Sequence, residues 1–349
     1  MRVVAMGGGT GLSTLLRGLK TFVADSAAPP GPSPSIRRLT AIVTVTDEGG
    51  SSGRLRREFG MLPPGDIRNC LVALAEDEQL LTRLFRYRFS DGRGLAGHSF
   101  GNLFLAALTH LSRDFAEAVR LSSEVLAIRG EIFPSTLSDV RLRARTVDGR
   151  LLRGESKITQ TPAPIRRLEM IPRGARPLPE ALSAIDEADL ITLGPGSLYT
   201  SLIPNLLVRG VAAHLARARA VRVLVVNLMT QPNETRGLTA SQHLRALREH
   251  AGGRRLIDYV VLNTTPVSRR VRKRYAAEGA APVTNDVDAV RKLGAEPVEA
   301  PLMEEAEVAR HDPHLLARLL LRLGSRPIRP RDRSASIATR GAGSRAIFD

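Results

Sequence analysis

Five short apolar runs, rich in β-branched residues, recur along this chain with helical patterns between most of them. They are Val3–Met6, Thr40–Thr46, Leu190–Leu193, Val221–Val226 and Tyr259–Leu262. Because these runs do not alternate between apolar and polar residues, both faces of each strand are expected to be buried. Strands of this kind, joined by helices, are typical of a parallel sheet covered on both sides. The sequence therefore predicts an α/β fold built on a parallel sheet.

Every predicted strand ends in glycine or in small polar residues. The carboxyl ends of parallel strands meet at one edge of the sheet, and ligands bind there in open α/β proteins. Five converging clusters therefore predict one binding site. The clusters are Gly7–Ser13, Asp47–Gly53, Gly194–Thr200, Asn227–Gln231 and Asn263–Thr265.

The first cluster, GGGTGLS, follows a predicted strand and precedes a helical pattern. Glycine lets the backbone turn sharply and approach a ligand, and the amides at a helix start favour an anion such as phosphate. We therefore expect Gly8, Gly9, Thr10 and Gly11 to contact the ligand. Leu12 stands where the dinucleotide fingerprint has its third glycine, and no Walker lysine follows, so the loop is not a P-loop.

The second cluster, TDEGGSSGR, brings carboxylates, hydroxyls and a guanidinium to a strand end. Asp47 and Glu48 would suit Mg²⁺ or a hydroxyl-rich ligand. Ser51 and Ser52 belong to a stretch that offers more backbone amides, and Arg54 can hold a phosphate through two hydrogen bonds. We place Asp47, Ser51, Ser52 and Arg54 in the predicted site.

Two predicted helix starts carry further polar side chains. In PPGDIRN, Asp66 either caps the helix or contacts the ligand, and we assign Asn69 to the same site. GHSFGN matches the G-x-S-x-G pattern of serine hydrolases, but a nucleophile elbow needs an apolar strand before it, and RFSDGRGLA is a loop pattern. We therefore interpret His98, Ser99 and Asn102 as hydrogen-bonding groups for the ligand.

The third and fourth clusters repeat this logic at two later strand ends. GPGSLYT places a glycine turn and hydroxyls before a helix start, so Gly194, Gly196 and Ser197 are candidates for anion binding. NLMTQPNET begins with Asn227, whose amide suits the edge of a base or a sugar ring.

The rest of the chain is divided by composition. We expect a surface loop at 24–38, helices over 67–127 and a small β-rich insertion at about 131–170, where Val147-Asp148-Gly149-Arg150 gives a hairpin turn signal. Residues 1–323 are expected to form one domain. Residues 324–349, rich in Arg, Pro and Ser, are expected to be a disordered tail.

Charge and cysteine content limit the classes of function. The net charge is +16, but the arginines are spread along the whole chain and aromatic residues make up only 4%, so we do not expect a nucleic-acid partner. No apolar run could span a bilayer. The single cysteine, Cys70, excludes an internal disulfide and fits the cytoplasm. Since no Cys or His pair has zinc spacing, we assign no metal ligand.

Taken together, these motifs resemble the YvcK family, whose members are called gluconeogenesis factors. The resemblance rests on GGGTGLSTLLRGLK, TDEGGSSGRLRREFGMLPPGDIRNCLVALA, GHSFGNLFLAAL, TLGPGSLYTSLIPNLLV and NLMTQPNET, and covers roughly residues 1–323. It implies a Rossmann-like three-layer fold related to that of 2-phospho-L-lactate transferase (a CofD-like fold). It also implies that Tyr275 stacks on a uracil and that Arg310 pairs with a diphosphate.

The sequence departs from the family at three places. Glu48 follows Asp47 where relatives usually have a second aspartate, which weakens the inference of a metal-dependent transferase. Asn233 replaces a glycine that often follows Gln-Pro and tolerates similar backbone angles. Pro313 stands where some relatives carry a threonine open to phosphorylation, so that regulation is not expected here.

The resemblance implies a cytosolic factor that binds UDP-sugars such as UDP-N-acetylglucosamine. Such a factor supports cell-wall precursor supply and cell shape during gluconeogenic growth, and its expected partners are a cell-wall precursor enzyme and a second copy of itself. The alternative is a phospholactate-type transferase that uses Asp47 and Glu48 with Mg²⁺ on a nucleotide-diphosphate donor. A nucleic-acid binder is the third and weakest reading.

Overall fold

The computed structural model describes residues 1–24, 35–76, 79–305 and 307–326. Most of the predicted loop at 24–38, and the predicted tail beyond Arg326, lie outside these residues. Within them, no helix is long and apolar enough to cross a membrane.

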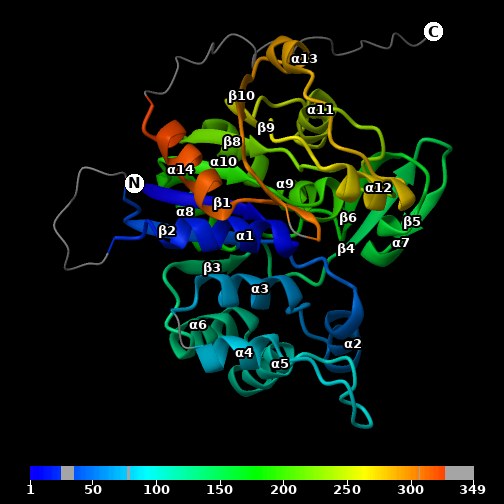
Figure 1. Cartoon of the computed structure of the whole chain (residues 1–349). Helices are drawn as coiled ribbons and strands as arrows, with labels where there is room; N and C mark the ends of the chain where they lie inside the picture. Colours follow the sequence, from blue (N-terminus) through cyan, green and yellow to red (C-terminus); the bar gives the residue numbers. More distant parts are fainter. Residues whose placement is uncertain (25–34, 77–78, 306, 327–349) are drawn as a thin grey trace, which may run out of the picture.

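A seven-stranded parallel sheet forms the centre of the molecule, as the sequence predicted (Figure 1). All five predicted strands lie next to one another in it, and their residues are almost entirely buried. In spatial order the strands are β10 (Glu296–Ala300), β9 (Tyr259–Asn263), β8 (Val221–Val225), β7 (Leu190–Leu193), β1 (Arg2–Gly7), β2 (Arg38–Val43) and β3 (Glu131–Pro134).

The two strands that the apolar pattern did not predict, β3 and β10, are the two edges of the sheet. Both are short and contain proline and glutamate, and β10 is largely half-exposed. An edge strand buries less surface than a central one and tolerates proline. For this reason neither strand shows a continuous apolar run.

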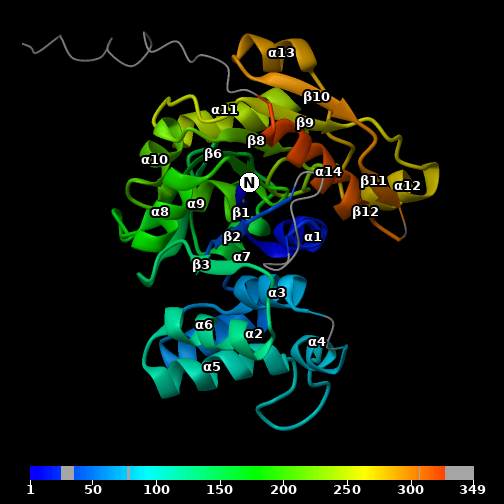
Figure 2. The ribbon, with the colours of Figure 1, turned by 90° about the vertical axis from the view of Figure 1, so that its left-hand side faces the viewer.

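Helices cover both faces of the sheet, which completes the three layers (Figure 2). One face carries α1 (Gly9–Lys20), α3 (Gly65–Leu74) and α14 (Pro313–Gly324). The other carries α8 (Pro179–Glu187), α9 (Ile203–Leu207), α10 (Val211–Arg217) and α11 (Ala240–His250), with the π-helical turn η1 (Leu198–Leu202) ahead of α9. The helix α13 (Val287–Lys292) precedes the edge strand β10.

The long connection from β2 to β3 is helical, in agreement with the prediction for 67–127. Its helices gather beside the β3 edge of the sheet in both views (Figures 1 and 2). They are α2 (Gly50–Phe59), α3, α4 (Gln79–Arg86), α5 (Phe100–Ser112) and α6 (Phe115–Val125).

The predicted β-rich insertion is present, but it begins later than expected. Residues 131–134 form β3 of the main sheet, and a separate antiparallel sheet has the order β5 (Leu151–Arg153), β4 (Arg141–Thr146) and β6 (Ile165–Ile171). The turn at Gly149, with φ of 87°, joins β4 to β5 as its sequence indicated. The short helix α7 (Glu155–Thr159) follows β5.

A small antiparallel hairpin and a basic helix flank the other side of the sheet's carboxyl edge. The hairpin is β11 (Met303–Glu305) with β12 (Ala309–His311), and the helix is α12 (Arg269–Ala277). Buried residues of α12 and of the loop after β8 form a satellite apolar cluster against which Tyr275 and Met303 pack.

Candidate functional site

The main cleft lies where the strand order of the sheet reverses. The chain runs outward from β1 to β2 and β3 on one side, and from β7 to β8, β9 and β10 on the other. In open α/β sheets, the carboxyl ends at such a switch point form a crevice. A cavity of about 290 Å³ is found there, lined by Gly9, Asp47, Asp66, Glu155, Thr159, Ser197, Thr200, Ser201, Gln231, Pro232, Asn233 and Glu234.

Glycines bring the loops after β1 and β7 into direct contact at this point. A Cβ at Gly11 would lie 2.4 Å from the carbonyl oxygen of Pro195, and a Cβ at Gly8 would lie 2.6 Å from Oδ2 of Asp66. Gly9 has φ of 64°, a conformation that L-residues rarely adopt. The glycines therefore allow a close approach between loops of the protein itself, and the expected approach of the backbone to a ligand stays a prediction.

Asp66 has a different role from the helix cap considered in the sequence. The N-cap of α3 is Pro64, and no side chain caps that helix. The carboxylate of Asp66 instead accepts a hydrogen bond from the backbone N–H of Gly9 at the start of α1. The N–H of Gly9, which we expected to bind an anion, is therefore already bonded to the carboxylate of Asp66.

Four carboxyl groups face the cavity: Asp47, Asp66, Glu155 and Glu234. Burial, and then the charge of Asp47, raises the pKa of Asp66 to about 7 and that of Glu155 to about 7. Burial also raises the pKa of Glu234 to about 7, although hydrogen bonds from Thr200 and Tyr199 act in the opposite direction. These groups therefore hold protons near neutral pH, where an ordinary carboxyl group is ionised.

The carboxyl oxygens have the chemistry that Mg²⁺ prefers. However, among residues 1–24, 35–76, 79–305 and 307–326 no three His, Cys, Asp or Glu side chains are grouped so that they could hold a metal ion. Glu48, the second carboxylate of the transferase hypothesis, does not line this cavity and lies 4.0 Å from the buried Arg56. The carboxylate that lines the cavity together with Asp47 is therefore Asp66 and not Glu48.

A smaller cavity of about 120 Å³ lies at the ends of β8 and β9, on the same carboxyl edge of the sheet. Its lining includes three amide side chains, Asn227, Asn263 and Asn285, and the guanidinium of Arg272. The Asn227 side chain accepts a hydrogen bond from Gly196 N (3.0 Å) and donates one to Gly196 O (2.9 Å). Asn227 thereby fixes the loop after β7, whose Ser197 lines the larger cavity.

Five other predicted residues form a buried polar network beneath the cleft. Ser51, Ser52, His98, Ser99 and Asn102 are at most 3% exposed. Ser51 Oγ lies 2.9 Å from His98 Nδ1, and Asn102 Nδ2 donates to Ser51 Oγ at 3.1 Å. Ser99 caps α5 by accepting from Asn102 N, so its motif is a helix start, as predicted. The network joins α2 to α5 and does not line the cavity.

The remaining predicted residues surround these two groups. Thr10 is exposed on α1, and Gly194 has φ of 82° in the loop after β7. Arg54 donates to Ala96 O, and Asn69 accepts from Arg68 at 2.7 Å.

Tyr275 lies on α12 and packs against the satellite apolar cluster, and Arg310 is exposed on β12. Neither residue lines either of the two cavities. Burial, followed by the charges of Arg86 and Arg310, lowers the pKa of Arg17 on α1. These three arginines therefore lie near one another, and none of them lines the cavity.

Sequence reasoning did not assign Glu155 and Thr159 to the site. Both residues lie on α7, the short helix that follows β5 of the small antiparallel sheet. They do not belong to a glycine-rich loop at the end of a central strand, which was the signal used to predict the site. Glu234 belongs to the NLMTQPNET cluster, but nothing in the pattern separates it from its neighbours. A buried carboxylate that accepts from Thr200 Oγ1 at 3.0 Å is visible only in the fold.

These features define a Rossmann-like α/β protein with an acidic cleft at its switch point. The family model described as "2-phospho-L-lactate transferase CofD" matches residues 3–303. The chain belongs to this CofD family, and the predicted resemblance is confirmed.

Relatives in the family carry a different name. The chain is 51% identical over 323 residues to a putative gluconeogenesis factor of Nostoc sp., covering 92% of this chain and 68% of that protein. It is 44% identical to the gluconeogenesis factor of Bacillus subtilis, covering 92% and 98%. A crystal structure of a UPF0052 family member from Bacillus halodurans has a TM-score of 0.85 at 44% identity, covering 91% and 98%.

Proposed function

We propose that this protein is a gluconeogenesis factor of the cytoplasm that binds a nucleotide-diphosphate sugar of the UDP-N-acetylglucosamine type. In this proposal it regulates an enzyme of cell-wall precursor supply, and so supports cell shape during growth on gluconeogenic carbon. The observation that carries the ligand class is the presence of two cavities at the carboxyl edge of the sheet, one of about 290 Å³ at the switch point and one of about 120 Å³ at the ends of β8 and β9.

The chemistry of the two cavities supports a ligand with a base at one end and a sugar at the other. Asn285 and Arg272 line the smaller cavity and can pair with the edge of a base, while the Asn263 amide holds the loop through hydrogen bonds with Thr265 and Leu302. Hydroxyl, amide and carboxyl groups line the larger cavity and can pair with sugar hydroxyls. In this proposal Arg310 pairs with the diphosphate, as the family resemblance implies.

A transferase of the phospholactate type is the second candidate, and one observation favours it. The raised pKa values of Asp66, Glu155 and Glu234 place proton-carrying groups in the cleft at neutral pH, as a general acid or base requires. If Mg²⁺ takes part, Asp47 and Asp66 are the residues that would hold it, and its contribution would be to neutralise the diphosphate.

Calorimetric titration separates these candidates. Purified protein is titrated with UDP-N-acetylglucosamine, GDP, GTP and NAD, each with and without Mg²⁺, and the mixtures are analysed by chromatography for new nucleotide products. We expect micromolar binding of the UDP-sugar and no turnover. Tight binding of a guanine nucleotide instead, or release of a nucleoside monophosphate, would overturn the regulatory proposal in favour of the transferase.

Replacing Asn227 by Ala should weaken binding of the UDP-sugar by about tenfold. The substitution leaves the N–H and C=O of Gly196 without their partner, at a cost of about 1 kcal/mol or slightly more, so the loop that carries Ser197 loses its fixed position. The matched control is Asp288→Asn on α13, an exposed change far from the cleft. Equal affinities for the two variants would contradict the role given to Asn227.

A further inference from the structure

The hydrogen-bond donors at two helix starts of the cleft are held by carboxyl groups of the protein itself. Asp66 accepts from Gly9 N at the start of α1. At the start of η1, Glu234 accepts from Tyr199 N at 3.3 Å and from the Thr200 hydroxyl at 3.0 Å, and it is only 4% exposed. The free N–H groups of a helix start favour an anion. In this cleft the protein supplies that anion from its own side chains.

No cationic side chain balances these carboxyl groups at the wall of the larger cavity. Four carboxyl groups line it, and among its described lining residues there is no Lys, Arg or His. Arg68 acts on the charge of Asp66, but its guanidinium donates to Ser99 Oγ and Asn69 Oδ1 and does not line the cavity. The wall of the larger cavity is therefore negatively charged wherever its carboxyl groups are ionised.

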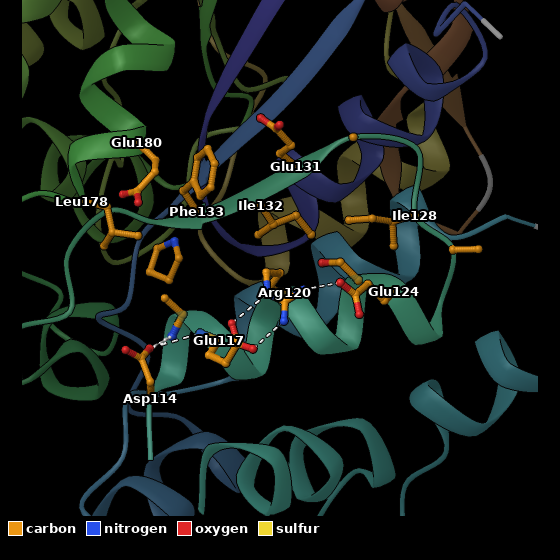
Figure 3. A pocket seen from close by; sticks show the side chains of 15 residues that line it. Asp114, Glu117, Arg120, Glu124, Ile128, Glu131, Ile132, Phe133, Leu178 and Glu180 are labelled. Carbon is orange, nitrogen blue, oxygen red and sulfur yellow. Dashed lines mark hydrogen bonds and ion pairs between the residues drawn. The ribbon is translucent and has the colours of Figure 1, made fainter. Parts of the chain in front are cut away.

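A second acidic cavity shows how such side chains are balanced elsewhere in this protein. This groove of about 670 Å³ lies at the β3 edge of the sheet, where it is lined by α6, β3 and the start of α8. Arg120 of α6 pairs there with both Glu117 and Glu124 (Figure 3). The cleft has no arginine in the equivalent role, so an anionic ligand group would meet uncompensated negative charge in it.

The larger cavity also contains a hydrogen-bond acceptor that has no donor. Gln231 donates through Nε2 to Ser197 Oγ at 2.6 Å, while its Oε1 is buried and has no hydrogen-bond partner in the described part of the chain. Two hydroxyls of the lining already donate within the protein, Thr200 to Glu234 and Thr159 to carbonyl oxygens of α7. A buried acceptor without a donor costs free energy. A ligand hydroxyl would supply the donor, and a carboxylate or phosphate would not.

We propose that Asp66 and Glu234 are specificity-determining residues, which exclude anionic groups from the larger cavity and reserve it for the neutral, hydroxyl-bearing ring of a nucleotide-diphosphate sugar. This inference rests on the proposed function and deepens it, because it names the class of sugar and places the diphosphate outside the larger cavity. The start of α1, whose glycine pattern predicted phosphate binding, binds the carboxylate of Asp66 instead.

Calorimetric titration with a matched pair of ligands tests the inference. UDP-N-acetylglucosamine carries a hydroxyl group at C6 of its sugar, and UDP-N-acetylglucosaminuronate carries a carboxylate at the same carbon. Both are titrated into the full chain at pH 8, where carboxyl groups with a pKa of about 7 are ionised. We expect the neutral sugar to bind about tenfold more tightly than the anionic one, since like charges in a binding site are costly.

Two variants of the cavity wall assign this selectivity to its residues. Glu234→Gln and Asp66→Asn each remove one negative charge, and each should lower the ratio of the two affinities by about threefold. Using both variants keeps the test valid if one of them fails to fold. The matched control is Glu180→Gln, which removes the same charge from an exposed position on α8 in the β3-edge groove (Figure 3) and should leave the ratio as it is.

The possible outcomes separate this inference from the proposed function. Equal affinity of the native chain for the two ligands would overturn the inference and leave the proposed function in place. A ratio that stays the same in both cavity variants would show that Asp66 and Glu234 do not set the specificity. Failure of both ligands to bind would overturn the proposed function, and the inference with it.

Discussion

Replacing Asp66 by Asn is expected to stabilise the protein at pH 8 and to do so much less at pH 5. Burial and the charge of Asp47 raise the pKa of Asp66 to about 7, against 3.8 for an ordinary aspartate. Between these values the folded state binds more protons than the unfolded state, so native stability falls as pH rises through this window and is level above it. Asparagine can still accept from Gly9 N and carries no charge.

The expected gain of the Asn variant over the native chain grows by on the order of 2 kcal/mol from pH 5 to pH 8. Urea unfolding at a series of pH values measures it. Because the change also removes a negative charge from the cleft, binding of a diphosphate ligand should tighten at pH 8. A gain that is the same at both pH values would show that Asp66 is ionised throughout.

Asp286 provides a control with the opposite sign. Burial acts against its charge, but hydrogen bonds from Ser241 and Thr239 outweigh burial and lower its pKa. Asp286→Asn should therefore destabilise the protein near neutral pH, and the loss should fade as pH falls below the ordinary aspartate value. With rising pH, the Asp66 variant should gain stability relative to the native chain and the Asp286 variant should lose it. Such opposite trends would show that the effect at Asp66 comes from its surroundings and not from the loss of a carboxyl group in general.

Replacing Arg222 by Leu is expected to cost about 3–5 kcal/mol of stability, because it breaks a buried ion pair. Arg222 is 1% exposed at the start of β8, and its guanidinium donates to both carboxyl oxygens of Asp258, at 3.0 and 2.8 Å. It also donates to the carbonyl oxygens of Leu215 and Arg255. The leucine variant leaves all these acceptors without this partner in a buried place.

Arg291→Leu is the matched control, because Arg291 pairs with Asp288 on the exposed surface of α13. Such an exposed ion pair contributes about 1 kcal/mol or less to stability. The urea concentration at the midpoint of unfolding should therefore be clearly lower for Arg222→Leu than for Arg291→Leu. If Arg222→Leu costs no more than Arg291→Leu, the buried pair does not hold β8 to β9 as described.

The central strands and the position of the site could be predicted from sequence because both depend on local composition. Runs such as Val221–Val226 are buried on both faces, so burial appears directly as an unbroken apolar run. Glycine and polar residues at the strand ends follow from the same topology, which brings Gly9, Asp47 and Ser197 to one cavity. The edge strands β3 and β10 have no such signal.

Which polar residues line the cavity, and which support it, could not be predicted in this way. The TDEGGSSGR and GHSFGN motifs contain similar polar residues. Asp47 nevertheless faces the cleft, while Ser51, Ser52, His98 and Asn102 bond to one another in the interior. Their partners are 47 to 51 residues apart in the chain for the closest of these bonds. Local pattern carries no information about such pairs.

The sequence by itself determined the parallel sheet, the glycine turns and the edge at which the loops meet, since each follows from burial and backbone freedom within a few residues. Tertiary structure alone decided that Glu155 and Glu234 join Asp47 and Asp66, and that Gly9 N serves Asp66. It also decided that acidic side chains of α6 line the open edge of β3. The physical reason is that charge, pKa and pairing depend on distances between residues remote in sequence, which only packing fixes.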